Sequence, residues 1–187
     1  MDDATAIPPQ KIASPGEVVS VELLELPHTA GCLVCGPDNP HAIGISSFVN
    51  SSTGTVMTQF TPRPHHIGFD DIVHGGVLAM VLDEIMVWAA TWRVRRFCVC
   101  GELVTRFRHS APPGAALRCE ALVDFSRPRL VETSSKVFDA SNRLIATGNG
   151  KYVPVSFEAH QRFVQTFHKE PATEAAATYI AQTHGTI

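Results

Sequence analysis

The feature that most restricts the fold is a helix-length segment almost without polar residues, which runs from His74 to Trp92 (HGGVLAMVLDEIMVWAATW). Two adjacent acids, Asp83 and Glu84, lie in its middle, and no helical register places either one on a polar stripe. A helix that is apolar on all sides is normally buried, and an unpaired buried carboxylate is costly. We therefore expect a buried helix whose acids are either hydrogen-bonded or used in chemistry.

Strand-like segments precede and follow this helix in the sequence, and the short segments between them are rich in turn-forming residues. A single helix cannot be buried on every side by loops. The simplest solution is an α+β fold in which a curved antiparallel β-sheet wraps around a long central α-helix, with a second copy of the chain covering what remains. The expected strands are Ile43–Asn50, Thr55–Thr61, Phe97–His109, Ala115–Ser126, Leu130–Asp139 and Arg143–Val155.

The length of 187 residues fits one domain with tails. We expect a lead-in over residues 1–30, a domain over 31–155 and a peripheral C-terminal tail over 156–187, helical in pieces and broken near Pro171. Within the lead-in, residues 17–26 fit either a short strand or a short helix.

Composition excludes several partners. The formal net charge of -3 gives no basic surface for nucleic acid. The longest apolar run is interrupted by Asp83 and Glu84 and falls short of a membrane span. The acidic N-terminus MDDATAIPPQ lacks the pattern of a targeting signal. The odd number of five cysteines argues against a disulfide framework and for a reducing compartment, so we expect a cytoplasmic protein.

The segment HGGVLAMVLDE resembles the hotdog-fold acyl-CoA thioesterases, in which HGG opens the central helix and an acid follows nine residues after the histidine. Asp83 stands at that spacing from His74. The resemblance is to the phenylacetate-pathway-type, HGG-containing branch. CLVCGPDNPHAIGI resembles the lead-in to the first strand in one branch of this superfamily, and GELVTRFRHSAPPG resembles the third strand and its turn. The resemblance covers roughly Cys32 to Val155.

The resemblance implies hydrolysis of an acyl-CoA or acyl-carrier-protein thioester, with coenzyme A present only as part of the substrate and no other cofactor. Such a reaction needs donors for the carbonyl oxygen and a carboxylate that activates water or attacks directly. Free N–H groups at a helix N-terminus suit the first task, and glycine admits a substrate closely. The family's oxyanion donor corresponds to Gly75, with Gly76 beside it, and the catalytic acid to Asp83.

Each candidate also has a structural interpretation. Asp83 could cap a backbone group instead of acting in catalysis. For Glu84 we favour a buried hydrogen bond over a role as the base, and for His74 we favour capping the helix over proton transfer.

Helix geometry places the two main candidates, Gly75 and Asp83, too far apart to act on the same carbonyl within one subunit. Asp83 is eight residues from Gly75, or about 12 Å along the axis at ~1.5 Å per residue, whereas a base and an oxyanion donor must both lie within about 3 Å of the reacting groups. The site must then combine Gly75 of one subunit with Asp83 of another. We expect an obligate homodimer, or a dimer of such dimers, with paired sites.

Two positions depart from the family pattern. Relatives often have Asn or Gln six residues before the histidine, where this chain has Gly68 with His66 close enough to substitute. A Ser or Thr before the core of the third strand is replaced by Cys100, whose thiol is a weaker hydrogen-bond partner. We therefore count these as candidate substrate-binding residues and keep two alternatives: a non-catalytic acyl-thioester binder, and a hotdog hydratase or dehydratase that uses His74 and Glu84.

A CxxC pair, Cys32 and Cys35, could be half of a zinc site with His28 or His41. No second CxxC exists, and the GPDNP that follows suits a tight turn, so we expect no metal. Several arginines could bind the phosphates of coenzyme A, but the sequence does not single one out: Arg93, Arg95, Arg96, Arg106 and Arg108.

Overall fold

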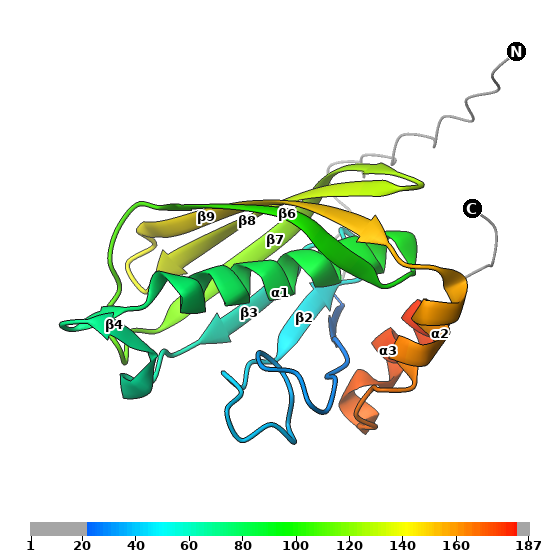
Figure 1. Cartoon of the computed structure of the whole chain (residues 1–187), viewed down its shortest axis with the longest axis horizontal. Helices are drawn as coiled ribbons and strands as arrows, with labels where there is room; N and C mark the ends of the chain where they lie inside the picture. The colour runs from blue at the N-terminus through cyan, green and yellow to red at the C-terminus, as the bar shows by residue number, and fades with distance from the viewer. Residues whose placement is uncertain (1–21, 183–187) are drawn as a thin grey trace, which may run out of the picture.

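The computed structural model describes residues 22–182, and its centre is one long helix, α1 (Gly75–Val94), packed along a seven-stranded antiparallel sheet (Figure 1). The strand order is β1-β2-β3-β7-β8-β9-β6, so β6 forms one edge of the sheet. A second, two-stranded sheet precedes the helix. The large sheet contains β1 (Leu23–Glu25), β2 (Ser47–Asn50), β3 (Val56–Phe60), β6 (Cys98–Phe107), β7 (Leu117–Arg127), β8 (Leu130–Asp139) and β9 (Leu144–Pro154); the small one contains β4 (Ile67–Phe69) and β5 (Ile72–Val73).

The predicted sheet around a long central helix is confirmed, and the differences are local. Strand β2 begins at Ser47 rather than Ile43, because Gly44 has a φ of 78° that breaks the extended backbone. The loop predicted before α1 contains a short 3-10 helix, η1 (Pro64–His66), and the β4–β5 hairpin. Residues 1–21 and 183–187 lie outside the described residues, so most of the predicted lead-in lies there too.

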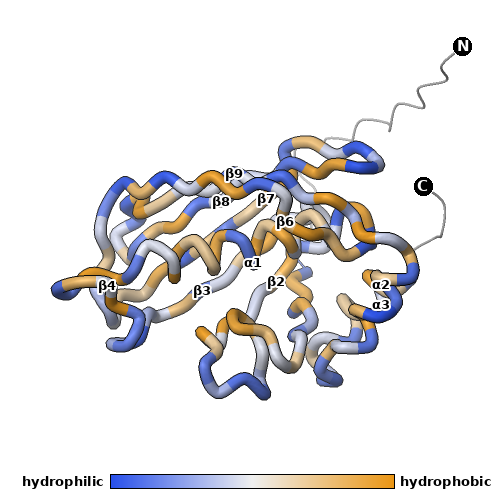
Figure 2. The backbone as a smooth tube through the Cα atoms, viewed as in Figure 1, coloured by the Kyte–Doolittle hydropathy of each residue, from blue (hydrophilic) through white to orange (hydrophobic). Residues whose placement is uncertain are grey.

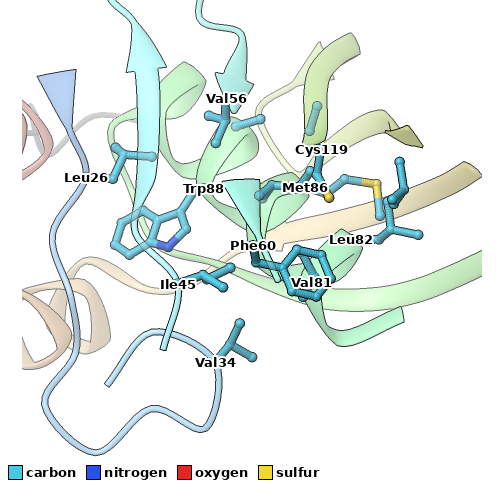
Figure 3. Close-up of a cluster of buried hydrophobic side chains, with 14 of the residues drawn as sticks. Leu26, Val34, Ile45, Val56, Phe60, Val81, Leu82, Met86, Trp88 and Cys119 are labelled. Carbon is cyan, nitrogen blue, oxygen red and sulfur yellow. The ribbon is translucent and has the colours of Figure 1, made fainter. Parts of the chain in front are cut away.

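The core lies between α1 and the sheet. Val81, Leu82 and Met86 on the helix are fully buried, together with side chains from β3 and β7 (Figure 3). Ile85 on the helix is fully buried as well. Along β8 and the first half of β7, buried positions alternate with more exposed ones, as expected for a sheet with one buried face. Apolar and polar residues are both present along the strands (Figure 2). Gly148 on β9 allows α1 to lie close to the sheet, because a Cβ at this position would lie 3.0 Å from Cε of Met86 on α1.

One surface of α1 remains only half-buried, along the residues Gly76, Ala79, Met80, Asp83 and Val87. Most of the edge strand β6 is exposed, and it presents apolar side chains to solvent: Val99, Leu103, Val104 and Phe107. An exposed apolar edge strand is normally covered by a partner. The half-buried surface of α1 and the exposed apolar strand β6 are therefore available to a second copy of the chain, as the sequence led us to expect.

The C-terminal tail is helical in pieces, as predicted, with α2 (Phe157–Val164), η2 (Pro171–Thr173) and α3 (Glu174–Ala181). It packs beside the C-terminal half of α1, where the Tyr179 ring stacks on Trp92 at 4.0 Å between centroids. No helix within residues 22–182 is long and apolar enough to cross a membrane. All five cysteines lie among the described residues and are free thiols.

Burial of His160 on α2 predicts that stability depends on pH. Its Nδ1 accepts a hydrogen bond of 3.1 Å from the Phe97 N–H, and burial, aided by the Arg96 charge, lowers the pKa of His160 below its ordinary 6.5. As pH falls below 6.5, this histidine binds a proton in the unfolded chain but not in the folded chain. The free energy of unfolding therefore decreases. Urea unfolding at pH 7, 6 and 5 should show a decrease of up to about 1.4 kcal/mol per pH unit from this group.

The control is His160→Asn, whose side-chain oxygen can still accept the bond from Phe97. The variant should lose less stability than the wild type between pH 7 and pH 5. Equal pH slopes in the two proteins would contradict the assignment.

Candidate functional site

The carboxylate of Asp83 is held by a residue that the sequence did not mark, Tyr152 on β9. The Tyr152 hydroxyl donates to Asp83 Oδ1 at 2.7 Å, and the tyrosine is fully buried while Asp83 is half-buried. Burial and the charge of Asp83 raise the pKa of Tyr152 well above its ordinary value, so the phenol stays protonated and donates. Gly150 makes room for this ring, since a Cβ there would lie 2.4 Å from Tyr152 Cε2.

Cys100 on β6 lies beside the same pair. Partial burial and, to a smaller extent, the nearby Asp83 carboxylate raise the pKa of Cys100 to about 11. Both neighbours of Asp83 therefore remain neutral near pH 7. Among Asp83, Tyr152 and Cys100, the carboxylate of Asp83 is therefore the group suited to act as a base or nucleophile.

The helix N-terminus is built from His74 and the two glycines. His74 Nδ1 accepts a 2.9 Å hydrogen bond from the Gly76 N–H, so the histidine caps the helix and this N–H is occupied. Among the residues that the structure describes, none accepts a hydrogen bond from the Gly75 N–H. The free donor at this terminus is therefore that of Gly75, where the helix dipole favours negative charge.

A cavity of about 560 Å³ opens at this terminus. It is lined by Gly68, His74, Gly75, Leu78, Phe107 and Arg108, among others. Gly68 lies against the His74 ring, since a Cβ there would be 3.1 Å from His74 Cδ2. Three of the predicted site residues, Gly68, His74 and Gly75, therefore line one cavity. Of the five candidate arginines, Arg108 lines it too.

Asp83 does not line this cavity. Gly75 and Asp83 lie on the same straight helix, about 12 Å apart along its axis at ~1.5 Å per residue. One protomer therefore does not bring the free N–H and the carboxylate to one reacting group, in agreement with the spacing of these residues in the sequence.

Comparison with known proteins identifies the domain. Residues 71–146 match the family model of the thioesterase superfamily. The predicted resemblance to this family is confirmed over these residues. This thioesterase match includes Gly75, Asp83 and Cys100 but ends before Tyr152. No curated protein matches the chain.

Solved structures confirm the hotdog fold of the thioesterase superfamily. A thioesterase superfamily protein aligns with a TM-score of 0.61 at 24% identity over 66% of this chain and 60% of its own, so this chain spans less than two thirds of that relative. PaaI of the Escherichia coli phenylacetic acid degradation operon aligns at 0.57, with 17% identity over 61% and 81%. A Streptococcus mutans protein bound to acetyl CoA aligns at 0.53, with 13% identity over 55% and 82%.

Glu84, next to the candidate catalytic acid Asp83, has different partners. Its Oε1 accepts a 3.0 Å hydrogen bond from Trp88 Nε1, and its Oε2 lies 3.9 Å from Cys32 Sγ. Burial, together with Cys32, raises the pKa of Glu84 to about 7. The Trp88 contact is of the structural kind that we favoured, whereas no local pattern indicated the contact with Cys32.

His66 also makes structural contacts. It is buried, its Nδ1 accepts a 3.1 Å hydrogen bond from the Arg63 N–H, and burial lowers its pKa. Its ring therefore fixes the turn of η1, and its carbonyl accepts from the His74 N–H at 2.8 Å. Through that second bond His66 helps to place the helix N-terminus.

Proposed function

We propose that this chain hydrolyses an acyl-CoA or acyl-carrier-protein thioester to a free acid and a thiol. The observation that carries the proposal is the Asp83 carboxylate, half-buried on an apolar helix and oriented by a neutral phenol. The thioesterase family match supports the reaction class. The acetyl CoA bound to the Streptococcus mutans relative supports an acyl-CoA as substrate.

In the proposed reaction, the free Gly75 N–H and the helix dipole stabilise the oxyanion that forms on the thioester carbonyl. Asp83 either removes a proton from the attacking water or attacks the carbonyl carbon itself. In the first route the C–S bond breaks and the sulfur leaves as the thiol with the proton that Asp83 took from water. In the second route the C–S bond breaks as a mixed anhydride forms on Asp83, the thiolate takes a proton from solvent, and a water molecule then hydrolyses the anhydride to the free acid and the Asp83 carboxylate. Tyr152 keeps the carboxylate in position and does not ionise.

The reacting groups come from two subunits in this proposal, so the working unit is a homodimer with two equivalent sites. The half-buried surface of α1 and the exposed apolar strand β6 support this assembly. Light scattering during size-exclusion chromatography should give twice the mass of the chain, or four times for a dimer of dimers. A monomer that hydrolyses thioesters would overturn the two-subunit site.

The hydrogen bond from Tyr152 to Asp83 predicts a kinetic effect. Tyr152→Phe should lower kcat by roughly 10-fold to 100-fold, because a displaced catalytic group loses its orientation, while KM changes little. Its unfolding free energy should fall by about 0.5–1.5 kcal/mol. The matched control is Tyr179→Phe on the tail, which should keep wild-type kcat. Equal kcat values in both variants would contradict the role of Tyr152.

Two alternatives are separated by one experiment on the wild-type protein. Short, long and aromatic acyl-CoAs are offered together with an enoyl-CoA, and both thiol release and water addition are measured. Thiol release supports the proposal. Saturable binding without release would favour a non-catalytic binder, which the missing side chain at Gly68 and the neutral thiol of Cys100 make worth testing. Hydration of the enoyl-CoA would favour the hydratase.

A further inference from the structure

We propose that Cys32, Cys35 and Glu84 form a binding site for one divalent transition-metal ion, of which Zn²⁺ is the best fit. The two Sγ atoms and one carboxylate oxygen all lie within 4.8 Å of one another. From the sequence we expected no metal, because no second CxxC exists and the residues after Cys35 suit a tight turn. The fold supplies that ligand from α1, 52 residues away from Cys32. The site does not depend on the proposed hydrolysis.

The distances suit a tetrahedral ion. With Zn–S of about 2.3 Å and Zn–O of about 2.1 Å, a tetrahedron has sulfur–oxygen edges of about 3.6 Å and sulfur–sulfur edges of about 3.8 Å. Cys32 Sγ lies 3.9 Å from Glu84 Oε2. The ligand atoms therefore need to move by only a few tenths of an ångström at this edge to bind an ion.

The loop that carries the cysteines is shaped to present thiolates. Cys32 Sγ accepts backbone N–H bonds from Val34 at 3.3 Å and from Cys35 at 3.5 Å, contacts that stabilise the metal-binding form of sulfur. The chain then turns at Gly36, whose N–H donates to the Cys32 carbonyl at 3.0 Å. A Cβ at Gly36 would lie 2.4 Å from that carbonyl oxygen, so only glycine permits this turn.

Glu84 is positioned as a ligating carboxylate usually is. Its second oxygen accepts the hydrogen bond from buried Trp88, which fixes the orientation of the group. Cys32 is partly exposed, so an ion and one water molecule can reach the cluster. Three protein ligands with a solvent molecule in the fourth position form an accepted zinc geometry, and two thiolates select zinc over magnesium or calcium.

The test uses the full chain, stripped with a chelator and then given ZnCl₂ in the presence of a phosphine reductant. Mass spectrometry of the desalted protein should find one zinc per chain. Cobalt(II) added instead should give thiolate-to-cobalt charge-transfer bands. Cys35→Ser should lose both signals, and Glu84→Gln should bind zinc more weakly by at least the roughly 10-fold that an outer-shell partner contributes.

The matched control is Cys100→Ser, which removes a cysteine outside the cluster and should still bind one zinc. The cobalt spectrum of the wild-type protein tests the site directly, so the result does not depend on whether a variant folds. Absence of both stoichiometric zinc and the cobalt–thiolate bands would overturn the proposal. So would zinc binding that survives in Cys35→Ser, or a Cys32–Cys35 disulfide that persists in reductant and excludes zinc.

Discussion

The Asp83→Asn variant is expected to lose thioester hydrolysis by a factor of about 10² to 10⁴ in kcat, the usual contribution of a positioned base. Asparagine has the same size, and its carbonyl oxygen can still accept the hydrogen bond that Tyr152 donates to Asp83. The fold and substrate binding should therefore survive, and the loss should fall on kcat rather than KM. The measurement is thiol release at saturating acyl-CoA.

Two further variants show whether the effect is specific to Asp83. Asp124→Asn makes the same chemical change at an exposed position on β7, where the carboxylate accepts a hydrogen bond from Ser134, and it should keep wild-type kcat. Glu84→Gln tests the competing acid. If Glu84→Gln abolished turnover while Asp83→Asn kept it, the assignment of the base would be wrong.

The second large effect is expected at Gly75, where one substitution can delete the proposed oxyanion donor alone. Gly75 is the first residue of α1, a position that tolerates proline, and His74 before it has φ −59° and ψ 130°, which a following proline accepts. Gly75→Pro should therefore keep the helix but remove the N–H, lowering kcat by about 10² to 10³.

Gly75→Ala is the matched control, because it adds a Cβ at the same place and keeps the N–H. That Cβ would lie 3.0 Å from the ring of Phe107, an exposed side chain that can move. Gly75→Ala should therefore lose much less activity than Gly75→Pro. Equal losses in the two variants would show that bulk at this position matters and the N–H does not.

Mixing the two inactive variants tests whether the site is shared between subunits. In a mixed dimer of Gly75→Pro with Asp83→Asn, one of the two sites combines an intact Gly75 with an intact Asp83. After unfolding and refolding a 1:1 mixture, half of the dimers are mixed and each has one working site, so activity should recover to about a quarter of wild type. No recovery from a mixture that forms mixed dimers would place both groups in one subunit.

The main elements could be predicted because their signals are local. The apolar run around Asp83 and Glu84 indicated the central helix, and the structure begins α1 one residue after His74. Strand β8 has the predicted bounds, since two clear turns flank it. The β4–β5 hairpin was missed because it is very short and its turn uses Asp70, a non-glycine residue with a φ of 49°.

The site contacts were less predictable because they depend on how the helix sits on the sheet. Tyr152 meets Asp83 across 69 residues, and Cys32 meets Glu84 across 52. A shift of one residue in the pairing of β9 would turn Tyr152 to the other face of the sheet. Nothing local to these residues carries that information, whereas the spacing of Gly75 and Asp83 lies within one helix and could be measured from the sequence.

The hydrogen bond between Tyr152 and Asp83 makes tight packing a condition for chemistry. A loosened state that kept its helix and strands but lost their fixed contact would separate the phenol from the carboxylate. Gly148, with no side chain between the sheet and Met86, helps to set the spacing at which they meet. On gentle heating or in dilute denaturant, turnover should therefore decline before far-ultraviolet circular dichroism changes, which would make enzymatic activity a sensitive reporter of native packing in this molecule.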